Sequence, residues 1–295
     1  MRQKVSFLTG LAIFGTVVLW GSAFVGIRYS LADYSPFHLA LLRFLVASAF
    51  LTVFAVAGRV RMPSARDLPL IFLTGFSGIG FYNLVLNYGA MTVNAGSTSF
   101  IISTAPIMTS LIAYAFLGER ISPLGWCSML VSLMGVSLIA FGQGDSFRFE
   151  SGALFVFTAA FSTSIFFVIQ KPLLKKYDSI EVTCYSIWIG TLFMLPFVGG
   201  LASVIAHAPL SSTLSVVYLG IFPAALAYFF WSYALARLPA SRSVSFLYMI
   251  PVAATLLAYL LIDEVPGTLA AAGGCTSLLG VVMLNTFGRI RTRTE

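Results

Sequence analysis

Charged side chains are scarce in this sequence. Of its 295 residues, 17 are Lys or Arg and 10 are Asp or Glu, which is 9% of the chain, whereas 59% of the residues are hydrophobic. Soluble domains carry about 25% charged residues, and a water-exposed surface around so much apolar material would need far more polar groups. The composition excludes a soluble enzyme, a soluble nucleic-acid-binding protein and a disordered chain. It predicts an integral membrane protein.

Cysteine and histidine are also rare. Cys127, Cys184 and Cys275 each lie in an apolar stretch and form no C-x-x-C pair, and His38 and His207 are far apart in the chain. Metal sites need clusters of such residues, and disulfide frameworks need paired cysteines. We therefore expect no metal, no other cofactor and no disulfide framework, with the cysteines packed as small apolar side chains.

Long apolar runs fill most of the chain. A bilayer core about 30 Å thick needs about 20 helical residues per crossing. Charges, polar runs and clusters of Pro, Gly and Asn divide the sequence into ten runs of this kind: 7–27, 36–57, 68–88, 95–117, 124–141, 152–170, 180–200, 213–235, 241–262 and 267–287. The runs are continuous rather than alternating, which predicts helices. The predicted fold class is an all-α membrane protein with ten transmembrane helices.

The positions of the positive charges predict the orientation. With a cytoplasmic N-terminus, 14 of the 17 Lys and Arg residues fall in cytoplasmic segments, Arg28 and Arg148 fall outside, and Arg43 lies within a run. Cytoplasmic loops of membrane proteins carry an excess of Lys and Arg. We therefore expect both termini in the cytoplasm. This placement accounts for most of the net charge of +7 without a nucleic-acid partner.

The second half of the chain repeats the first after a shift of 145 residues. The aligned positions include residues that shared apolar composition does not explain: Pro106 with Pro251, Glu119 with Glu264, Gly135 with Gly280, Gly75 with Gly220 and Gly78 with Pro223. Each copy would hold five runs, an odd number, so the second copy must enter the membrane from the opposite side. The pattern predicts two domains, 1–145 and 146–295, related as an inverted repeat, which is a feature of secondary transporters. Their substrate site is expected near the membrane midplane, between the halves.

Several motifs accompany the repeat. They are Leu19-Trp20-Gly21-Ser22-Ala23-Phe24, Arg43, Pro106, Gly118-Glu119-Arg120 and Gly135, with Pro251, Glu264 and Gly280 in the second copy. In these residues the chain resembles the drug/metabolite transporter superfamily of the ten-helix EamA type, and within it the YddG-like exporters of amino acids. The resemblance implies two inverted five-helix bundles, each EamA-like, and a central cavity lined by helices 1, 3, 4, 6, 8 and 9. It also implies export of metabolites across a bacterial-type inner membrane.

Polar and aromatic side chains within the predicted helices are the candidate substrate contacts. Polar groups are unfavourable against lipid, so we expect them to face protein or a wet cavity. Aromatic walls with neutral hydrogen-bonding groups suit small zwitterions or neutral amphipathic molecules. The candidate substrate-binding residues are Trp20, Phe24, Tyr82, Asn83, Ser99, Ser103, Ser164, Tyr228, Ser245 and Tyr248.

Arg43 is the one charge well inside a predicted helix, about 10 Å along it from Pro36. Such a charge needs a partner, because the membrane interior does not solvate it. One interpretation is a contact to a substrate carboxylate, or a gate or coupling role. The alternative is a structural link to backbone carbonyls or to Asp33.

Two pairs of residues that the shift of 145 aligns are candidates for a role in conformational change. Glu119 and Glu264 are candidates for a gate or a coupling group; the alternative is a hydrated helix-end carboxylate paired with a neighbour such as Arg120. Pro106 and Pro251 are candidate hinges, because proline removes a helical hydrogen bond. The alternative is a kink at which Ser and Thr hydroxyls bind the freed carbonyls.

These observations favour an inner-membrane transporter that exports small metabolites by alternating access. Amino acids, including aromatic or other neutral ones, are the favoured substrates, and facilitated diffusion is favoured because no acidic residue lies near the centre of a predicted helix. Proton-coupled efflux of drugs or other neutral metabolites is the alternative, and a pore-type channel is the alternative of another class. The sequence has no P-loop, so transport driven by ATP is not expected. It has no H-E-x-x-H and no G-x-S-x-G, so no enzymatic activity is expected. The expected partners are a small-molecule substrate and the lipid bilayer, with no nucleic acid and with a monomer as the simplest assembly.

Overall fold

The apolar runs fold as helices because a helix bonds every backbone group within its own segment, as the membrane interior requires. The computed structural model describes residues 5–58, 60–93, 95–142, 152–262, 265, 267–288 and 290–291. Within them, ten helical segments are long and apolar enough to cross a membrane: Phe7–Ser30, Pro36–Gly58, Leu68–Gly89, Thr98–Leu117, Pro123–Gly142, Ala153–Leu173, Ser179–Val198, Leu210–Arg237, Ala240–Leu260 and Thr268–Phe287. The predicted ten helices are confirmed, and their ends differ by three residues at most.

Five of these segments are single uninterrupted helices. They are α1 (Phe7–Ser30), α2 (Pro36–Gly58), α7 (Pro123–Gly142), α8 (Ala153–Leu173) and α15 (Thr268–Phe287). The seventh segment joins α9 (Ser179–Met194) to the short 3-10 helix η2 (Leu195–Val198), and α10 (Leu201–His207) follows outside it.

The other four segments are interrupted. The third consists of α3 (Leu68–Gly75), the π-helix η1 (Phe76–Gly80) and α4 (Phe81–Ala90), and the eighth of α11 (Leu210–Leu219), the π-helix η3 (Gly220–Leu226) and α12 (Ala227–Arg237). The fourth breaks between α5 (Ala95–Ile102) and α6 (Ala105–Leu117). In the ninth, the 3-10 helix η4 (Phe246–Met249) separates α13 (Ala240–Ser245) from α14 (Ile250–Ile262). Both kinds of interruption recur after the shift of 145 residues.

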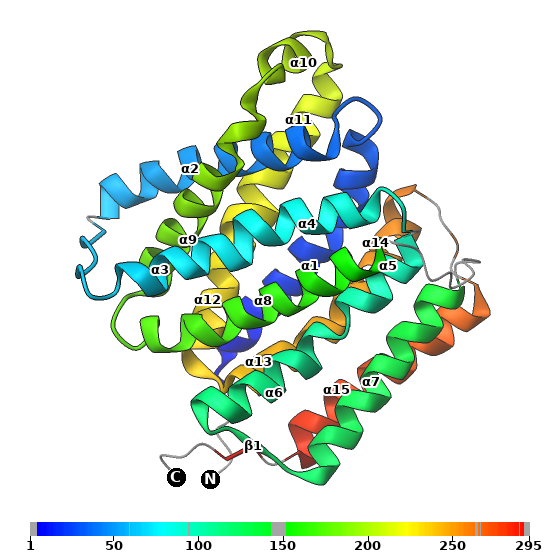
Figure 1. Ribbon diagram of the computed structural model, residues 1–295. Helices are drawn as coiled ribbons and strands as arrows, with labels where there is room; N and C mark the ends of the chain where they lie inside the picture. The colour runs from blue at the N-terminus through cyan, green and yellow to red at the C-terminus, as the bar shows by residue number, and fades with distance from the viewer. Residues whose placement is uncertain are drawn as a thin grey trace.

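Helices from the two halves of the sequence pack against each other. α1 packs against α12 and α14, α2 against α9 and η3, and α4 and α6 against α8 (Figure 1). The pair α7 and α15 lies along one side of the molecule. A Cβ atom on Gly135 would lie 2.2 Å from the backbone nitrogen of Ser277, and one on Gly280 would lie 2.3 Å from Oγ of Ser132. These glycines let the two backbones approach closely, as small residues do between membrane helices.

Several segments meet at one end of the molecule. Strand β1 (Arg120–Ile121) pairs antiparallel with β2 (Ile290–Arg291). Val5, just before α1, packs in one cluster with Leu238, and Ala240 bonds to the Glu119 carboxylate beside β1. We call this end the β1 end. The β1–β2 pair and α10 were not predicted from the sequence.

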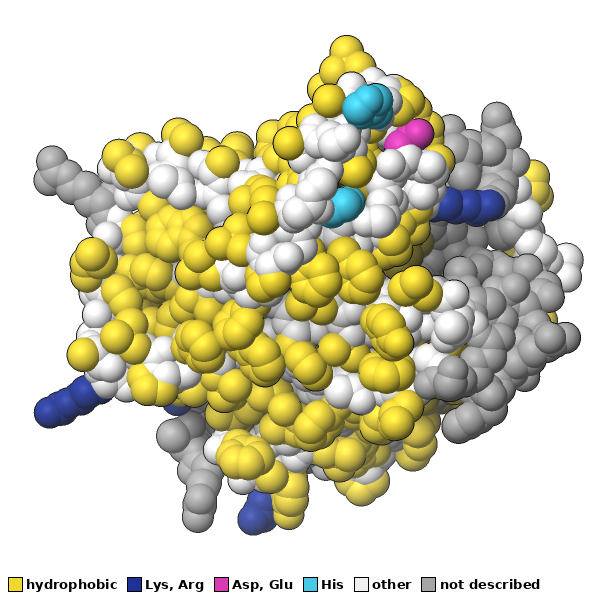
Figure 2. Space-filling model, turned by 45° about the horizontal axis from the view of Figure 1, so that its top comes forward, with side chains coloured by type: hydrophobic (Ala, Val, Ile, Leu, Met, Phe, Trp, Pro, Cys, Tyr) yellow, Lys and Arg dark blue, Asp and Glu magenta, His cyan; other side chains and the backbone are white. Residues whose placement is uncertain are grey.

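The outer surface is largely apolar. Large hydrophobic side chains are strongly exposed on many helices, Phe7 at 84% and Phe116 at 80% among them. Figure 2 shows hydrophobic side chains over most of the face turned to the viewer, with few charged ones among them. In water this surface would be unfavourable, whereas against lipid it is the expected one.

Candidate functional site

Aromatic side chains from both halves of the chain meet in the interior. Trp20 lies 5.2 Å from Tyr228 and 5.8 Å from Trp231, measured between ring centroids. Phe44 and Phe166 lie 6.4 and 6.2 Å from Tyr228, and Phe167 lies 4.7 Å from Trp231. These spacings are those of interacting aromatic pairs. The central aromatic cluster is defined by these side chains: Trp20, Phe44, Phe166, Phe167, Tyr228 and Trp231.

Two backbone features position the cluster. The indole Nε1 of Trp20 donates a 3.0 Å hydrogen bond to the carbonyl oxygen of Pro223, which lies inside the π-helix η3. This bond fixes α1 against the interrupted helix of the other half. Gly78 lies in the other π-helix, η1, and a Cβ atom there would come within 2.2 Å of the Phe166 ring. The missing side chain therefore leaves the space that the ring occupies.

Arg43 lies beside this cluster, on α2 and seven residues after its first residue, Pro36. Its Nη2 donates a 3.0 Å hydrogen bond to Oδ1 of Asn83, and its guanidinium carbon lies 4.7 Å from the centre of the Phe44 ring. Asn83 in turn donates from Nδ2 to the carbonyl of Ile79 in η1, at 2.8 Å. The hydroxyls of Tyr82 and Tyr228 are close enough to interact electrostatically with Arg43. Arg43 thus faces the interior, not lipid.

No carboxylate forms an ion pair with Arg43 among the residues that the structure describes. Asp33, the partner considered from the sequence, instead accepts a hydrogen bond from Ser212. The guanidinium Nε of Arg43 is buried and has no hydrogen-bond partner within the described part of the chain. The predicted link to Asp33 is therefore wrong.

Two further buried polar atoms near the cluster have no partner among the described residues. They are Nε1 of Trp231 and Oε1 of Gln170. Gln170 follows Phe167 of the cluster by three residues on α8, and its Nε2 lies 3.5 Å from the hydroxyl of Ser232, the residue after Trp231. A buried polar group without a partner costs about 1–3 kcal/mol. These atoms are therefore positioned to gain from a polar ligand.

The structure brings some of the predicted substrate contacts together and separates others. Trp20 and Tyr228 belong to the cluster, and Tyr82 and Asn83 lie beside Arg43. Phe24 is 53% exposed on the outer surface. Tyr248 is buried in a different group of side chains, between α7 and α15, which contains Met129, Val136, Val281 and Leu284.

Three of the predicted serines bond to backbone carbonyls at the helix interruptions. Ser103 donates to the carbonyl of Ser99 at 2.7 Å, and Ser245 donates to that of Arg242 at 2.8 Å. Ser164 is fully buried and donates to Ala105 at 3.0 Å, at the start of α6. Ser99 is half-buried near the same break. These contacts are those expected if the hydroxyls satisfy the kinked backbone.

Both prolines lie next to a break in their helix. α5 ends at Ile102 and α6 begins at Ala105, one residue before Pro106. In the second half, η4 ends at Met249 and Pro251 is the second residue of α14. The breaks therefore occur where the loss of a helical hydrogen bond predicted them. Hinge motion at Pro106 and Pro251 stays a prediction.

Glu119 connects the two halves at the β1 end. Its carboxylate accepts hydrogen bonds from the backbone N–H of Ala240 at 2.7 Å and of Ser241 at 2.9 Å, and from the Ser241 hydroxyl at 2.7 Å. Glu119 is only 2% exposed, whereas Arg120 is exposed. The interpretation as a hydrated carboxylate paired with Arg120 is therefore wrong. Glu264, its counterpart in the repeat, lies outside the described residues.

Lys171 binds the same turn as Glu119, from the α12 side. Its Nζ donates 2.6 Å hydrogen bonds to the carbonyls of Leu235 and Leu238, at the end of α12. A cation thus binds the last carbonyls of one helix, and the Glu119 anion binds the first amides of the next, α13. Helix ends favour these signs of charge. The turn between α12 and α13 is held from both sides. Lys171 was not among the residues predicted from the sequence to form a site.

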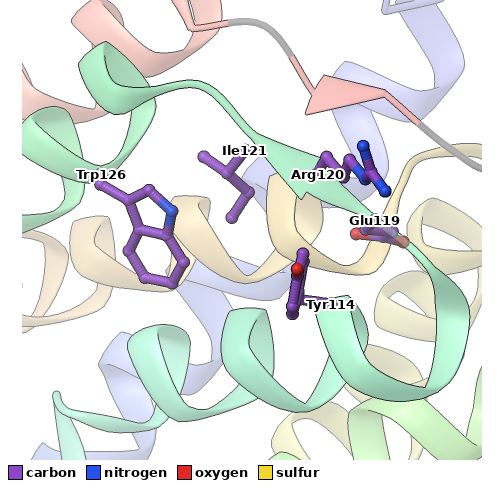
Figure 3. A pocket seen from close by; sticks show the side chains of 5 residues that line it. All are labelled: Tyr114, Glu119, Arg120, Ile121 and Trp126. Carbon is purple, nitrogen blue, oxygen red and sulfur yellow. The ribbon is translucent and has the colours of Figure 1, made fainter.

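A separate pocket of about 320 Å³ lies at the same end, between α6, β1 and α7. It is lined by Tyr114, Glu119, Arg120, Ile121 and Trp126. Figure 3 shows the Tyr114 and Trp126 rings on its sides and the side chains of Glu119 and Arg120 close together at one edge. Tyr114 is 57% exposed, so this pocket opens at the surface and is distinct from the central aromatic cluster.

Ion pairs join the loop that follows α2 to the loop that follows α8 and to the first turn of α9. Arg61 binds Glu181 through Nε at 3.0 Å and through Nη2 at 3.1 Å. Lys176 lies 2.7 Å from Asp67, which also accepts a hydrogen bond from the Tyr177 hydroxyl at 2.8 Å. The bonds from Lys176 and Tyr177 lower the pKa of Asp67, and the Asp67 carboxylate raises the pKa of Lys176.

These features define a class: a helical membrane protein whose two halves pack around an aromatic interior, in which some polar groups have no partner among the described residues. The chain belongs to the EamA-like transporter family, whose model matches residues 8–141 and again 150–286. It is therefore a membrane transporter, and its bacterial relatives and apolar helices make it a multi-pass protein of a bacterial inner membrane.

Individual relatives cover nearly the whole chain. The chain is 43% identical over 263 residues to the uncharacterized transporter YdfC of Bacillus subtilis (strain 168), covering 89% of this chain and 86% of the relative. It is 40% identical over 278 residues to a probable terminal-alkyne amino-acid exporter of Streptantibioticus cattleyicolor, covering 94% and 93%. A protein of known crystal structure superposes with a TM-score of 0.77 at 21% identity, over 93% of this chain and 95% of the other. That likeness shows the fold alone.

Proposed function

We propose that the protein exports small metabolites from the cytoplasm, with amino acids, including aromatic and other neutral ones, as its substrates. The observation that carries the proposal is the central aromatic cluster, which both halves build beside a cation that lacks a carboxylate partner among the described residues. Aromatic walls suit an apolar or aromatic side chain, and the polar atoms suit the charged groups of a zwitterion. The relative at 40% identity, a probable amino-acid exporter, supports the same class of substrate.

Alternating access is the proposed mechanism. The family model matches the chain twice, and both kinds of helix interruption recur after 145 residues. The glycines at the α7–α15 contact are reciprocal: Gly135 lies against Ser277, and Gly280 against Ser132, positions that the same shift relates. Inverted repeats of this kind expose one central site to each side in turn, as one bundle moves against the other. Pro106 and Pro251 would serve as the hinges.

Glu119 acts as a gate in this proposal. Its bonds to Ala240 and Ser241 hold the first half against the second at the β1 end, where Lys171 holds the same turn. The end carries Arg120, Arg237 and Arg242 as well, and this excess of positive charge supports its assignment to the cytoplasmic side. The arrangement is then the state in which the cytoplasmic side is closed.

We propose facilitated diffusion, that is, transport down the substrate gradient without coupling to protons. The charged side chain beside the cluster is Arg43, and among the described residues no Asp or Glu lies with it. Proton-coupled efflux of drugs or other neutral metabolites remains the alternative. Glu119 is the candidate coupling group in that case, since it is buried and bonds to the other half.

The test is uptake of labelled phenylalanine into liposomes that contain the purified protein, with and without a proton gradient. We expect saturable uptake without a gradient. Uptake only with a gradient would favour proton coupling, flux that does not saturate would favour a channel, and no uptake of any amino acid would contradict the substrate class.

The contribution of the cluster is tested with two variants of the same helix. Trp20→Ala removes a ring and the bond to Pro223, and we expect it to lower phenylalanine uptake at least tenfold. Phe24→Ala, four residues further along, removes a ring that is 53% exposed and should leave uptake within about twofold. Equal losses in both variants would contradict the placement of the site.

A further inference from the structure

The guanidinium of Arg43 is a charge whose capacity for hydrogen bonding is only partly used. One nitrogen, Nη2, bonds to the neutral Asn83, whereas Nε is buried and unpaired within the described structure. A charge at this depth is strongly unfavourable without a counter-ion. An amide oxygen carries no net charge, so Asn83 orients the guanidinium without neutralising it.

The surroundings of Arg43 indicate which counter-ion fits. The guanidinium presents N–H groups as a fork that matches the two oxygens of a carboxylate. Tyr82 and Tyr228 lie close enough to interact with it, and Tyr228 is also a member of the central aromatic cluster. A molecule with a carboxylate at Arg43 would therefore have its side chain directed among aromatic rings.

The opposite charge lacks an equivalent partner there. Among the described residues, no Asp or Glu acts electrostatically on Arg43 or on Tyr228, so none there would bind an ammonium group by charge. The available acceptors are neutral, such as the unpaired Oε1 of Gln170. The described residues of the site thus offer a charged partner to the carboxylate of a substrate and only neutral acceptors to its ammonium group.

We propose that Arg43 binds the substrate carboxylate, and that the transporter selects hydrophobic molecules with a carboxylate and does not require a free ammonium group. This inference rests on the proposed function, whose substrates it narrows. N-acylated amino acids and the corresponding deaminated acids are then substrates, whereas amino-acid amides and amines are not. Asn83 is a positioning residue that holds the guanidinium toward the site.

The experiment measures inhibition of labelled phenylalanine uptake by unlabelled analogues in proteoliposomes. N-acetylphenylalanine and 3-phenylpropanoate retain the carboxylate, whereas phenylalaninamide and phenethylamine lack it. We expect the first two to inhibit within about threefold of phenylalanine, and the last two at least tenfold more weakly, because a hydrogen bond to a charged group is lost. Equal inhibition by phenylalanine and phenylalaninamide would overturn the inference and leave the proposed function standing.

Two variants separate substrate binding from a structural role. Arg43→Gln should abolish the preference for carboxylates. Asn83→Asp puts a carboxylate next to the guanidinium, and we expect this carboxylate to form an ion pair with Arg43 in place of the substrate. Inhibition by all compounds with a carboxylate should then weaken at least tenfold, while the protein stays folded. A purely structural link would be strengthened by Asn83→Asp, so unchanged uptake and selectivity in that variant would contradict the inference. Arg237→Gln is the control, because Arg237 lies over the Tyr233 ring at the end of α12 and should not affect selectivity.

A binding measurement makes the test independent of transport. Trp20 and Trp231 lie in the cluster, so their fluorescence should change when 3-phenylpropanoate binds the purified protein. Binding that requires Arg43, in a protein that transports no amino acid, would support the inference and contradict the proposed function. A fluorescence response of equal size and affinity in Arg43→Gln would overturn the inference.

Discussion

The charges of Glu119 and Lys171 lie against backbone groups at helix ends that compensate them. Glu119 accepts two backbone N–H bonds at the start of α13, and Lys171 donates to carbonyls at the end of α12. Glu119 and its partners are separated by about 120 positions in the chain. The sequence therefore showed an acidic residue at the end of an apolar run, but not the groups to which it bonds. The same holds for Arg43, whose contact to Asn83 became visible only with the fold.

Removal of the Glu119 carboxylate should destabilise the contact between the halves. Glu119→Ala leaves the N–H groups of Ala240 and Ser241 without their acceptor, which we expect to lower the free energy of unfolding by about 2–4 kcal/mol. Thermal unfolding in detergent measures the effect. Arg120→Gln, at the exposed neighbour, is the control and should change stability by less than about 0.5 kcal/mol. Equal stability of the two variants would contradict the contact.

The pair of Asp67 and Lys176 should shape the dependence of stability on pH. The pKa of Asp67 is lowered in the folded protein, so its contribution is present above the unfolded pKa of about 3.9 and is lost as pH falls through the folded value. The pKa of Lys176 is raised, so its contribution is present below the unfolded pKa of about 10.4 and is lost as pH rises through the folded value.

Asp67→Asn should therefore lower the melting temperature slightly between about pH 5 and 9 and reduce its fall below pH 4. The effect is small because the Lys176 side chain is exposed to solvent. Melting temperatures of both proteins across this range test it. An equal fall of the melting temperature below pH 4 in the two proteins would show that Asp67 contributes nothing to the sensitivity to acid.

At the scale of elements, the ten membrane helices could be predicted because each needs a long apolar run, and their ends were accurate to three residues. The breaks near Pro106 and Pro251 followed from the missing N–H of proline. The aligned breakers Gly75, Gly220 and Pro223 marked the regions of η1 and η3, but no pattern indicated that these would be π-helices. The 3-10 helix η4 and the β1–β2 pair depend on neighbouring segments and were likewise unpredictable.

The close contact of α7 and α15 gives a prediction at this scale. Gly135→Ala places a methyl group where the Ser277 backbone already lies, so the helices must separate. We expect a loss of about 1–3 kcal/mol in unfolding free energy. Gly10→Ala in α1 is the matched control, since its Cβ meets no atom within 4 Å, and it should be neutral or slightly stabilising. Thermal unfolding in detergent compares them, and a stable Gly135→Ala protein would contradict this packing.

At the scale of the whole molecule, the sequence could indicate a site between two halves but not which side chains form it. Trp20 and Phe24 lie four residues apart on the same side of α1, yet Trp20 packs on Tyr228 while Phe24 is exposed. Apolar surface faces both lipid and protein in a membrane, so hydrophobicity does not distinguish the two positions. Trp231, which follows Tyr228 by three residues on α12, could have been found from that helical spacing.

The central claim is that one interior site, beside Arg43 and the aromatic cluster, opens to each side of the membrane in turn. The direct measurement is the reaction of a single cysteine, Tyr82→Cys, with a maleimide that does not cross membranes, in a protein whose Cys127, Cys184 and Cys275 are replaced by Ala. We predict reaction when the reagent is added from either side, slowed by phenylalanine in both cases. Reaction from one side alone, or reaction that phenylalanine does not slow, would contradict the account.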